Sequence, residues 1–243
     1  MDNPLILGLI AATIIGISKG GIKGVSVLAV TLMALAYDAK NSTGIILPLL
    51  IVGDILAVIY FKKHTKWKYL IYFLPFTLIG VLIASMVGKN LPEAVFKQWM
   101  AAIILVSVLF MWLSESSTKH IAPSNKLFGS SVGLLAGFTT MIGNLAGPFA
   151  NLFFLSTKIP KNEFIGTSAW AFFIINNVKV PLHIWSWGTI NMETLSINLK
   201  LLPCIVLGFV VGIKLVDYFS EKFFRQFILA VTALGAILIF LKN

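Results

Sequence analysis

The sequence predicts an all-α protein that crosses a membrane several times and is built from two inverted repeats. Low charge, long apolar runs and an internal duplication support this prediction. Of the 243 residues, 58% are hydrophobic and 12% are charged, whereas about a quarter of the residues in a soluble domain are charged. Several apolar runs approach or exceed the ~18 residues typical of a membrane span. They lack the period-two alternation expected of a membrane β-barrel.

Two of the apolar segments are interrupted near their middle. Residues 5–37 contain SKGGIKG, and residues 127–155 contain GNLAGP. As one helix the first would run ~50 Å, against a hydrocarbon core of ~30 Å, and glycine and proline permit a turn. Each segment is expected to form a helical hairpin, either re-entrant or made of tilted crossings. Six further segments have the length of ordinary spans: 44–61, 69–88, 96–113, 164–182, 195–216 and 224–241.

The second half of the chain repeats the first. At an offset of 128, Pro75 matches Pro203 and Glu93 matches Glu221, within six identities over 25 gap-free positions. The predicted repeats, each a hairpin followed by three spans, are residues 1–118 and 119–243. Because three full crossings are an odd number, the two repeats are inverted. Inverted repeats with broken helices are typical of secondary transporters, whose substrate site lies where the breaks meet.

The distribution of basic residues supports this topology. If each hairpin returns to its starting side, loops 62–68, 114–126, 156–163 and 217–225 share one face and carry ten Lys and Arg residues, against four on the other face. The positive-inside rule places the richer face in the cytoplasm. Both termini are then expected on the non-cytoplasmic side of the cell membrane. The net charge of +10 is thus interpreted as a topology signal, not a nucleic-acid surface.

The first break holds the most informative polar residues. Lys19 and Lys23 stand beside glycines between apolar runs. They are predicted to line an anion site, helped by glycine N–H groups and by the positive end of a half-helix starting near Gly24. The alternative is that both are ordinary cytoplasmic loop charges. The other members of this predicted site are Ser18, Gly20 and Gly21.

Asp54 is the only acidic residue well inside one of the six ordinary spans. A carboxylate in hydrocarbon is costly and is a functional candidate by default. Two roles are open for Asp54: accepting a coupling proton, or forming an ion pair with Lys19, Lys23 or Lys179. A purely structural pair is the remaining alternative.

The second half offers amides and one cation. Asn176, Asn177 and Lys179 lie in FFIINNVKVPLHIW, and Asn177 falls close to the repeat counterpart of Asp54. Adjacent amides either donate to an anion's oxygens or hydrogen-bond between helices. Lys179 either contacts substrate or extends outward to the interface.

The second break adds Asn144 and Gly147 to the predicted substrate site. Asn144 sits where Ser18 and Lys19 sit in the first break. The two breaks are expected to approach each other inside the protein.

Several other functions are not expected. The single cysteine, Cys204, allows no intramolecular disulfide, and no His/Cys cluster has metal-ligand spacing. No metal or cofactor is therefore predicted. The sequence shows no nucleophile elbow, phosphate-binding loop or paired catalytic carboxylates, so the protein is not expected to be an enzyme. His183, Trp185 and Trp187 are expected at the outer membrane interface.

Four stretches carry a family resemblance: GISKGGIKG, STGIILPLLIVGDILAVIYFKKHTKWKYL, MIGNLAGP and KNEFIGTSAWAFFIINNVKVPLHI. Together they resemble the sulfite exporter TauE/SafE family over nearly the whole chain. Many members carry a longer glycine run followed by proline in each hairpin, whereas the first hairpin here has Lys19 and Lys23 and no following proline. The resemblance implies a secondary transporter that moves a small sulfur-containing anion, sulfite or an organosulfonate, across the cytoplasmic membrane by alternating access, with export as the expected direction.

Three alternatives stay open at this point. The chain is a carrier for another small organic anion, a non-transporting membrane scaffold, or a membrane enzyme that uses Asp54. The expected partners are a small anionic substrate and the lipid bilayer, with proton coupling as an option. No motif encodes the oligomeric state.

Overall fold

The computed structural model describes residues 4–22, 24–116, 126–157 and 159–215, together with Ala233, Ile237 and Ile239. Within these residues all regular secondary structure is helical. The predicted all-α class is therefore confirmed. The helices are α1 (Pro4–Lys19), α2 (Ser26–Ala36), α3 (Ala39–Phe61), α4 (Trp67–Lys89), α5 (Glu93–Ser116), α6 (Lys126–Gly143), α7 (Ala146–Ser156), α8 (Lys161–Pro181) and α9 (Met192–Leu215), with a 3-10 turn η1 (Lys62–His64) and a π-helical turn η2 (Leu182–Ser186).

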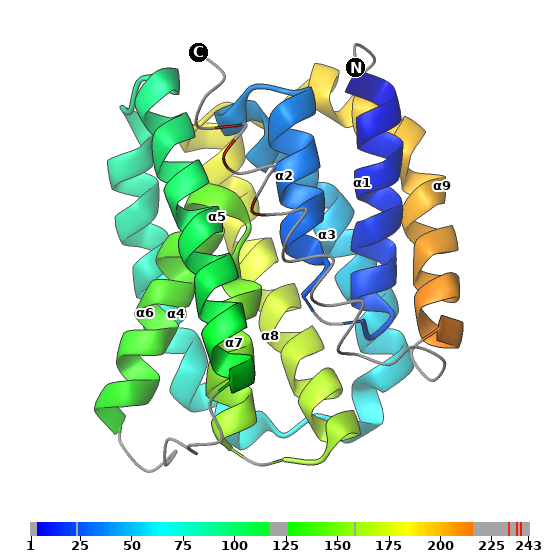
Figure 1. The fold of residues 1–243 in the computed structure, drawn as a ribbon, viewed down its shortest axis with the longest axis vertical. Helices are drawn as coiled ribbons and strands as arrows, with labels where there is room; N and C mark the ends of the chain where they lie inside the picture. Colours follow the sequence, from blue (N-terminus) through cyan, green and yellow to red (C-terminus); the bar gives the residue numbers. More distant parts are fainter. Residues whose placement is uncertain are drawn as a thin grey trace.

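Both interrupted segments fold back as helical hairpins. α1 and α2 enter from the upper end of the molecule in Figure 1 and return to it, whereas α6 and α7 enter from the lower end. The returning helices α2 and α7 each have 11 residues, or ~17 Å at 1.5 Å per residue, about half of a ~30 Å membrane core. The two hairpin tips therefore end inside the molecule.

Opposite entry of the two hairpins is the arrangement that inverted repeats require. The predicted last span, 224–241, lies outside the described residues except for Ala233, Ile237 and Ile239. The division into repeats 1–118 and 119–243 accordingly stays a prediction.

Each hairpin packs closely against a long helix. A Cβ on Gly16 of α1 would overlap the backbone oxygen of Ile205 in α9, and a Cβ on Gly137 of α6 would overlap the backbone oxygen of Thr77 in α4. Glycines at these positions let helix backbones approach, as small residues commonly do in membrane bundles. The hairpins are therefore fixed to α9 and α4 by backbone contact.

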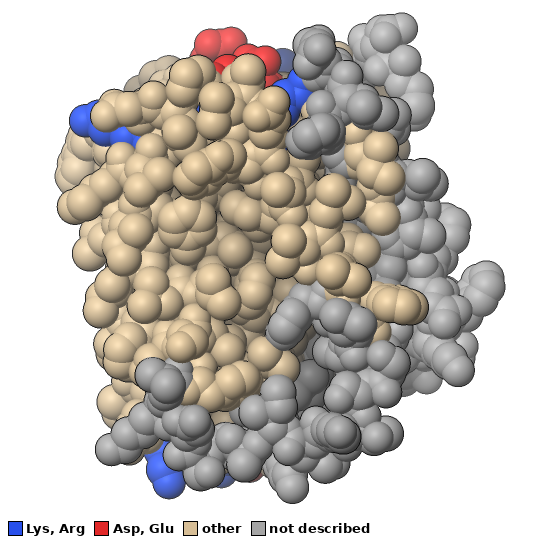
Figure 2. Space-filling model, turned by 60° about the vertical axis from the view of Figure 1, so that its left-hand side comes forward, with Lys and Arg blue, Asp and Glu red and all other residues tan. Residues whose placement is uncertain are grey.

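The outer surface between the two ends is apolar. On the face in Figure 2 the described charged side chains gather at the upper and lower ends, and none lies between them. Large apolar residues are widely exposed, including Ile71 at 69% and Leu199 at 73%, which a protein surrounded by water avoids. Among the described residues three helices are long and apolar enough to cross a membrane: Ala39–His64, Trp67–Lys89 and Met192–Leu215. These features identify the membrane-embedded part of the protein.

Two basic loops predicted to share one face lie at one end of the structure. Lys66, after η1, places its Nζ 3.0 Å from Glu163 Oε1 at the start of α8, and its backbone N–H donates to Thr167 Oγ1. The loop before α8 therefore lies beside loop 62–66. Which end faces the cytoplasm stays a prediction.

Candidate functional site

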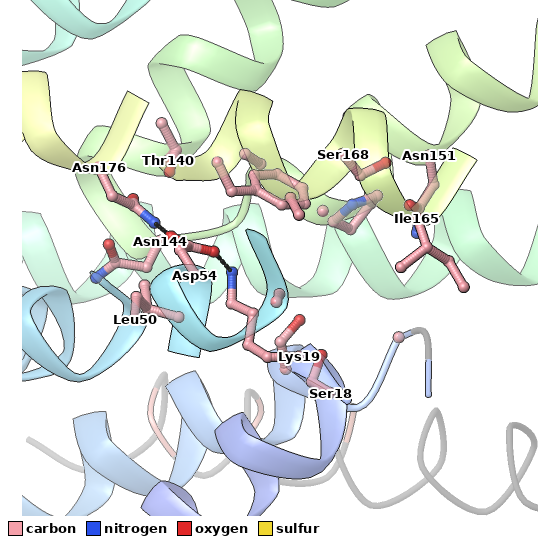
Figure 3. Close-up of a pocket in the computed structure, with 18 of the residues that line it drawn as sticks. Ser18, Lys19, Leu50, Asp54, Thr140, Asn144, Asn151, Ile165, Ser168 and Asn176 are labelled. Atoms are coloured by element: carbon pink, nitrogen blue, oxygen red, sulfur yellow. Dashed lines mark hydrogen bonds and ion pairs between the residues drawn. The ribbon is translucent and has the colours of Figure 1, made fainter. Parts of the chain in front are cut away.

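A cavity of about 100 Å³ lies between the two hairpin tips. Residues of both breaks line it, together with residues of α3 and α8 (Figure 3). A Cβ on Gly147 of the second tip would lie 3.8 Å from Ser26 Oγ at the start of α2. The two breaks, predicted from the sequence to approach each other, therefore do meet inside the protein. The polar residues and glycines of the wall are Ser18, Lys19, Gly21, Gly24, Ser26, Asp54, Thr140, Asn144, Gly147, Asn151, Ser168 and Asn176.

Unusual backbone angles bring the tips to the cavity. In the first break Gly21 has φ 124° and Gly24 has φ 87°, and in the second Asn144 has φ 56°. Glycine adopts such left-handed conformations freely, and asparagine is among the few other residues that tolerate them. The glycines of the first break and Asn144 of the second thus reverse the chain within a few residues.

The first tip forms a buried ion pair with α3. Lys19 Nζ donates to Asp54 Oδ1 at 2.5 Å, and Asn176 Nδ2 donates to Asp54 Oδ2 at 2.7 Å. The Lys19 ammonium also lies 4.7 Å from the centre of the Phe172 ring, a cation–π distance. Asp54 is fully buried, and a buried carboxylate is stable only when its oxygens are paired or hydrogen-bonded. Lys19 and Asn176 each supply a donor to one of the two oxygens.

The second tip forms an equivalent contact with α8. Lys179 Nζ donates to Asn144 Oδ1 at 2.5 Å and lies 3.3 Å from Thr140 Oγ1 and 3.4 Å from Asn176 Oδ1. Asn144 Nδ2 donates to the backbone oxygen of Thr43 at 3.1 Å. Lys179 is fully buried, so the alternative that it extends to the interface is wrong. It lies directly behind three residues of the cavity wall, Thr140, Asn144 and Asn176.

With both lysines protonated, the network that joins the two tips carries a net positive charge. Its described charged groups are the ammonium groups of Lys19 and Lys179 and the carboxylate of Asp54, which leaves one cation without a carboxylate partner. Asn176 links the two halves, because it donates to Asp54 and accepts from Lys179. An excess cation inside a membrane protein is costly, and an anion in the cavity would offset this cost.

A family model described as sulfite exporter TauE/SafE matches residues 5–239. The chain belongs to this family. Among curated proteins and solved structures, nothing matches the chain significantly. The match covers both hairpins and every described helix, and it agrees with the apolar outer surface. Because TauE/SafE proteins are a family of membrane transporters, the chain is a membrane-embedded transporter.

In this TauE/SafE protein most of the predicted site residues come together. Lys179 does not line the cavity itself, but it donates hydrogen bonds to two residues that do, Asn144 and Asn176. Within the described residues no group of His, Cys, Asp and Glu has the arrangement of a metal site. The predicted residues that line the cavity are Ser18, Lys19, Gly21, Asp54, Asn144, Gly147 and Asn176.

Two predicted residues are placed differently, and a third cannot be compared. Gly20 packs against α9, where a Cβ would lie 2.7 Å from the backbone oxygen of Phe209. Asn177 is exposed, and its Nδ2 donates to the backbone oxygen of Phe173 one turn earlier. Lys23 lies outside the described residues.

Of the three residues expected at the outer membrane interface, Trp185 is the most exposed. Trp185 is 83% exposed. His183 is instead fully buried, with Nδ1 2.8 Å from Thr189 Oγ1, and Trp187 donates from Nε1 to the backbone oxygen of Ser85. The π-helical turn η2 turns these two side chains toward the protein interior.

Six polar or aromatic wall residues were not predicted from the sequence: Ser26, Thr140, Asn151, Phe164, Ser168 and Phe172. Helical spacing offered a signal for two of them. Ser168, Phe172 and Asn176 follow one another at intervals of four residues along α8, which places them on one face. If Asn176 faces the cavity, this spacing predicts that Phe172 and Ser168 face it as well.

The repeat itself contained a second signal. Asn144 lies 125 positions after Lys19, and Lys179 lies 125 positions after Asp54. Within each half the two residues are hydrogen-bonded to each other: Lys19 donates to Asp54, and Lys179 donates to Asn144. At this offset of 125, slightly shorter than the offset of 128 that aligns the later spans, Lys179 rather than Asn177 corresponds to Asp54.

Proposed function

We propose that the chain is a secondary transporter that exports a small sulfur oxyanion, sulfite or an organosulfonate, across the cell membrane. The cavity between the hairpin tips is its substrate site. The observation that carries this proposal is the buried network around the cavity, in which two lysines face one aspartate. The excess positive charge favours an anion over a neutral or cationic substrate.

Helix ends add to this preference. α2 begins at Ser26 and α7 begins at Ala146, and both residues line the cavity. The N-terminus of a helix carries partial positive charge and free N–H groups. In transporters with broken helices, such half-helix ends commonly point at anionic substrate groups. Two of them meeting at one cavity support an anion site.

The size and lining of the cavity fit a small anion with a short carbon part. Its volume is about 100 Å³, where one water needs ~10–15 Å³. Apolar side chains also line it, among them Val27, Ile165 and Ala169. Sulfite fills the polar part alone, and an organosulfonate adds contacts with the apolar part.

The position of the cavity along α8 suggests a direction of access. Its lining extends from Asn176 toward Ile165, near the end of α8 that contacts loop 62–66. Beyond Asn176, the buried Lys179 and His183 occupy the opposite half. We assign loop 62–66 to the cytoplasm, so that the cavity loads from the cytoplasmic side, as export requires.

We assign Asp54 the role of ion-pair partner for Lys19. Two hydrogen bonds already hold its carboxylate, so a fixed negative charge positions Lys19 at the cavity wall. Proton coupling is the alternative role, and it predicts that substrate movement acidifies or alkalinises the vesicle interior. Recording internal pH with a trapped dye during transport separates the two roles.

Flux of anions into proteoliposomes tests the proposed function. Saturable movement of sulfite or methanesulfonate, absent from protein-free vesicles, is expected. Preference for acetate would favour a carrier of carboxylates. Equal leakage of every anion with and without protein would favour a scaffold and contradict the proposal.

Labelling of introduced cysteines tests the sidedness. In a Cys204→Ser background, cysteines replacing Lys63 and Asn191 are both at exposed positions. An impermeant thiol reagent added to intact cells should label position 191 only. Labelling at position 63 alone would reverse the assigned topology.

A further inference from the structure

Ser168 carries a hydroxyl that the fold buries without a partner. Its side chain lies on α8 and lines the cavity between the hairpin tips (Figure 3). The residue is only 7% exposed, and its Oγ has no hydrogen-bond partner among the described residues. Buried hydroxyl groups are nearly always hydrogen-bonded, so an unpaired one on a cavity wall marks where a ligand's acceptor atom fits.

Other hydrogen-bond donors line the same cavity. Asn151 of α7 lies at the same end of the view as Ser168 in Figure 3. The first turn of α7 borders the cavity at Ala146, Gly147 and Pro148. Pro148 has no N–H, but the N–H groups of Ala146 and Gly147 belong to the first turn, whose donors have no partner within the helix. A hydroxyl, an amide and a helix N-terminus together suit a ligand that accepts several hydrogen bonds.

Within this donor group, Ser168 is separated from the ion pair. Ser168 and Asn176 are eight residues apart on α8, or ~12 Å along the axis. Phe172 lies midway between them, with the Lys19 ammonium 4.7 Å from its ring centre. An anion near Asn176 would also lie near the Asp54 carboxylate and be repelled by it. An anion near Ser168 avoids that repulsion and still benefits from the net positive charge.

We propose that Ser168 and Asn151, with the N-terminus of α7, form the subsite for the oxygens of a sulfonate or sulfite group. In this arrangement Ser168 Oγ donates to one anion oxygen and the Asn151 amide to another. Lys19 and Lys179 act on the anion through their charge. The inference rests on the proposed function, because it assigns the substrate's head group to one end of the proposed substrate cavity.

The chain offers a matched control for a test of Ser168. Ser107 of α5 is also fully buried with an unpaired Oγ, but it does not line the cavity. Ser168→Ala and Ser107→Ala therefore delete the same kind of hydroxyl, and neither breaks a hydrogen bond among the described residues. Ser168→Thr keeps a hydroxyl at the site. Half-saturation of sulfite and methanesulfonate flux is measured for each, together with the unfolding midpoint in detergent with and without methanesulfonate.

Ser168→Ala is expected to raise the half-saturating concentration about tenfold or more, because a hydrogen bond to a charged group is lost. Ser107→Ala and Ser168→Thr should stay within about threefold of the wild type. Asn151→Ala should weaken binding in the same direction as Ser168→Ala. The unfolding midpoint without anion should be the same for both alanine variants, and the upward shift with methanesulfonate should be lost only in Ser168→Ala.

The remaining outcomes contradict the inference. If Ser168→Ala matches the wild type in half-saturation while the wild type transports, the subsite is wrong and the proposed function stands. If Ser107→Ala weakens transport as much as Ser168→Ala, the effect belongs to packing and the subsite is again wrong. If the wild type neither binds nor moves these anions, the subsite and the proposed function fail together.

Discussion

The two hairpin tips make similar contacts with opposite chemistry. In the first, the hairpin supplies the cation Lys19 and the following long helix supplies the acceptor Asp54. In the second, the hairpin supplies the acceptor Asn144 and the long helix supplies the cation Lys179. Both contacts measure 2.5 Å. With both lysines protonated, the first pair is neutral overall and the second keeps a positive charge. We therefore expect stability to depend mainly on the first pair and anion affinity on the second.

The largest loss of stability is expected when one partner of the Lys19–Asp54 ion pair is removed. Lys19→Met leaves Asp54 fully buried with one partner, and removing one member of a buried ion pair typically costs ~3–5 kcal/mol. Adding Asp54→Leu removes the unpaired charge and should restore most of this loss. Thermal unfolding in detergent measures both. A double variant no more stable than Lys19→Met would show that the pair does not hold the first tip.

The charged pair should control affinity. Lys179→Met removes the excess cation, which at an effective dielectric constant of ~20 and a separation of roughly 12 Å is worth about 1.4 kcal/mol to an anion. The half-saturating concentration of sulfite should rise about tenfold, with a smaller loss of stability than in Lys19→Met. Unchanged half-saturation in folded protein would remove Lys179 from anion binding. Lys200→Met, at an exposed position on α9, is the control.

A smaller loss of stability, similar for the two hairpins, is expected where each hairpin packs against its long helix. Gly16→Ala and Gly137→Ala place a methyl group against backbone atoms of the neighbouring helix, and overpacking typically costs ~1–3 kcal/mol. Gly147→Ala is the control, since its new methyl would meet Ser26 Oγ at an ordinary 3.8 Å. Unfolding midpoints give the answer. A control as destabilised as the other two would contradict the close-packing argument.

The smallest change in stability and half-saturation is expected at Asn177, in contrast to its neighbour Asn176. Asn176 bonds to Asp54 and lines the cavity, whereas Asn177 bonds only to its own helix among the described contacts. Asn177→Leu should change stability and half-saturation very little, within the ~0.5 kcal/mol usual for surface positions. Asn176→Leu should reduce both. Similar behaviour of the two variants would mean that α8 is rotated from its described orientation.

The helices and both breaks could be predicted because their signals are local. Glycines and a proline interrupt apolar runs at 17–24 and 143–148, and each run's length is set by the membrane. Lys19, Asp54 and Asn144 stood out for the same reason, as polar residues among apolar neighbours. The fold class and three contributors to the cavity therefore follow from the sequence.

The remaining features of the site could not be predicted from the sequence, because they depend on tertiary packing. Adjacent residues on a helix differ by ~100° in direction, so only the packing of α8 against α3 decides between Asn176 and Asn177. A serine in a membrane helix is ordinary, and only its unpaired hydroxyl at a cavity distinguishes Ser168. Two tryptophans suggested an interface position for His183, but the π-helical turn η2 buries it.

The central claim is that both hairpin tips hold one anion between them. Selenite resembles sulfite and scatters X-rays anomalously, so diffraction from crystals grown with selenite locates the anion directly. A selenium peak in the cavity, within hydrogen-bonding distance of Ser168 and bordered by Gly21 and Gly147, is the predicted result. Peaks confined to exposed lysines at the ends of the molecule, with none between the tips, would contradict the claim.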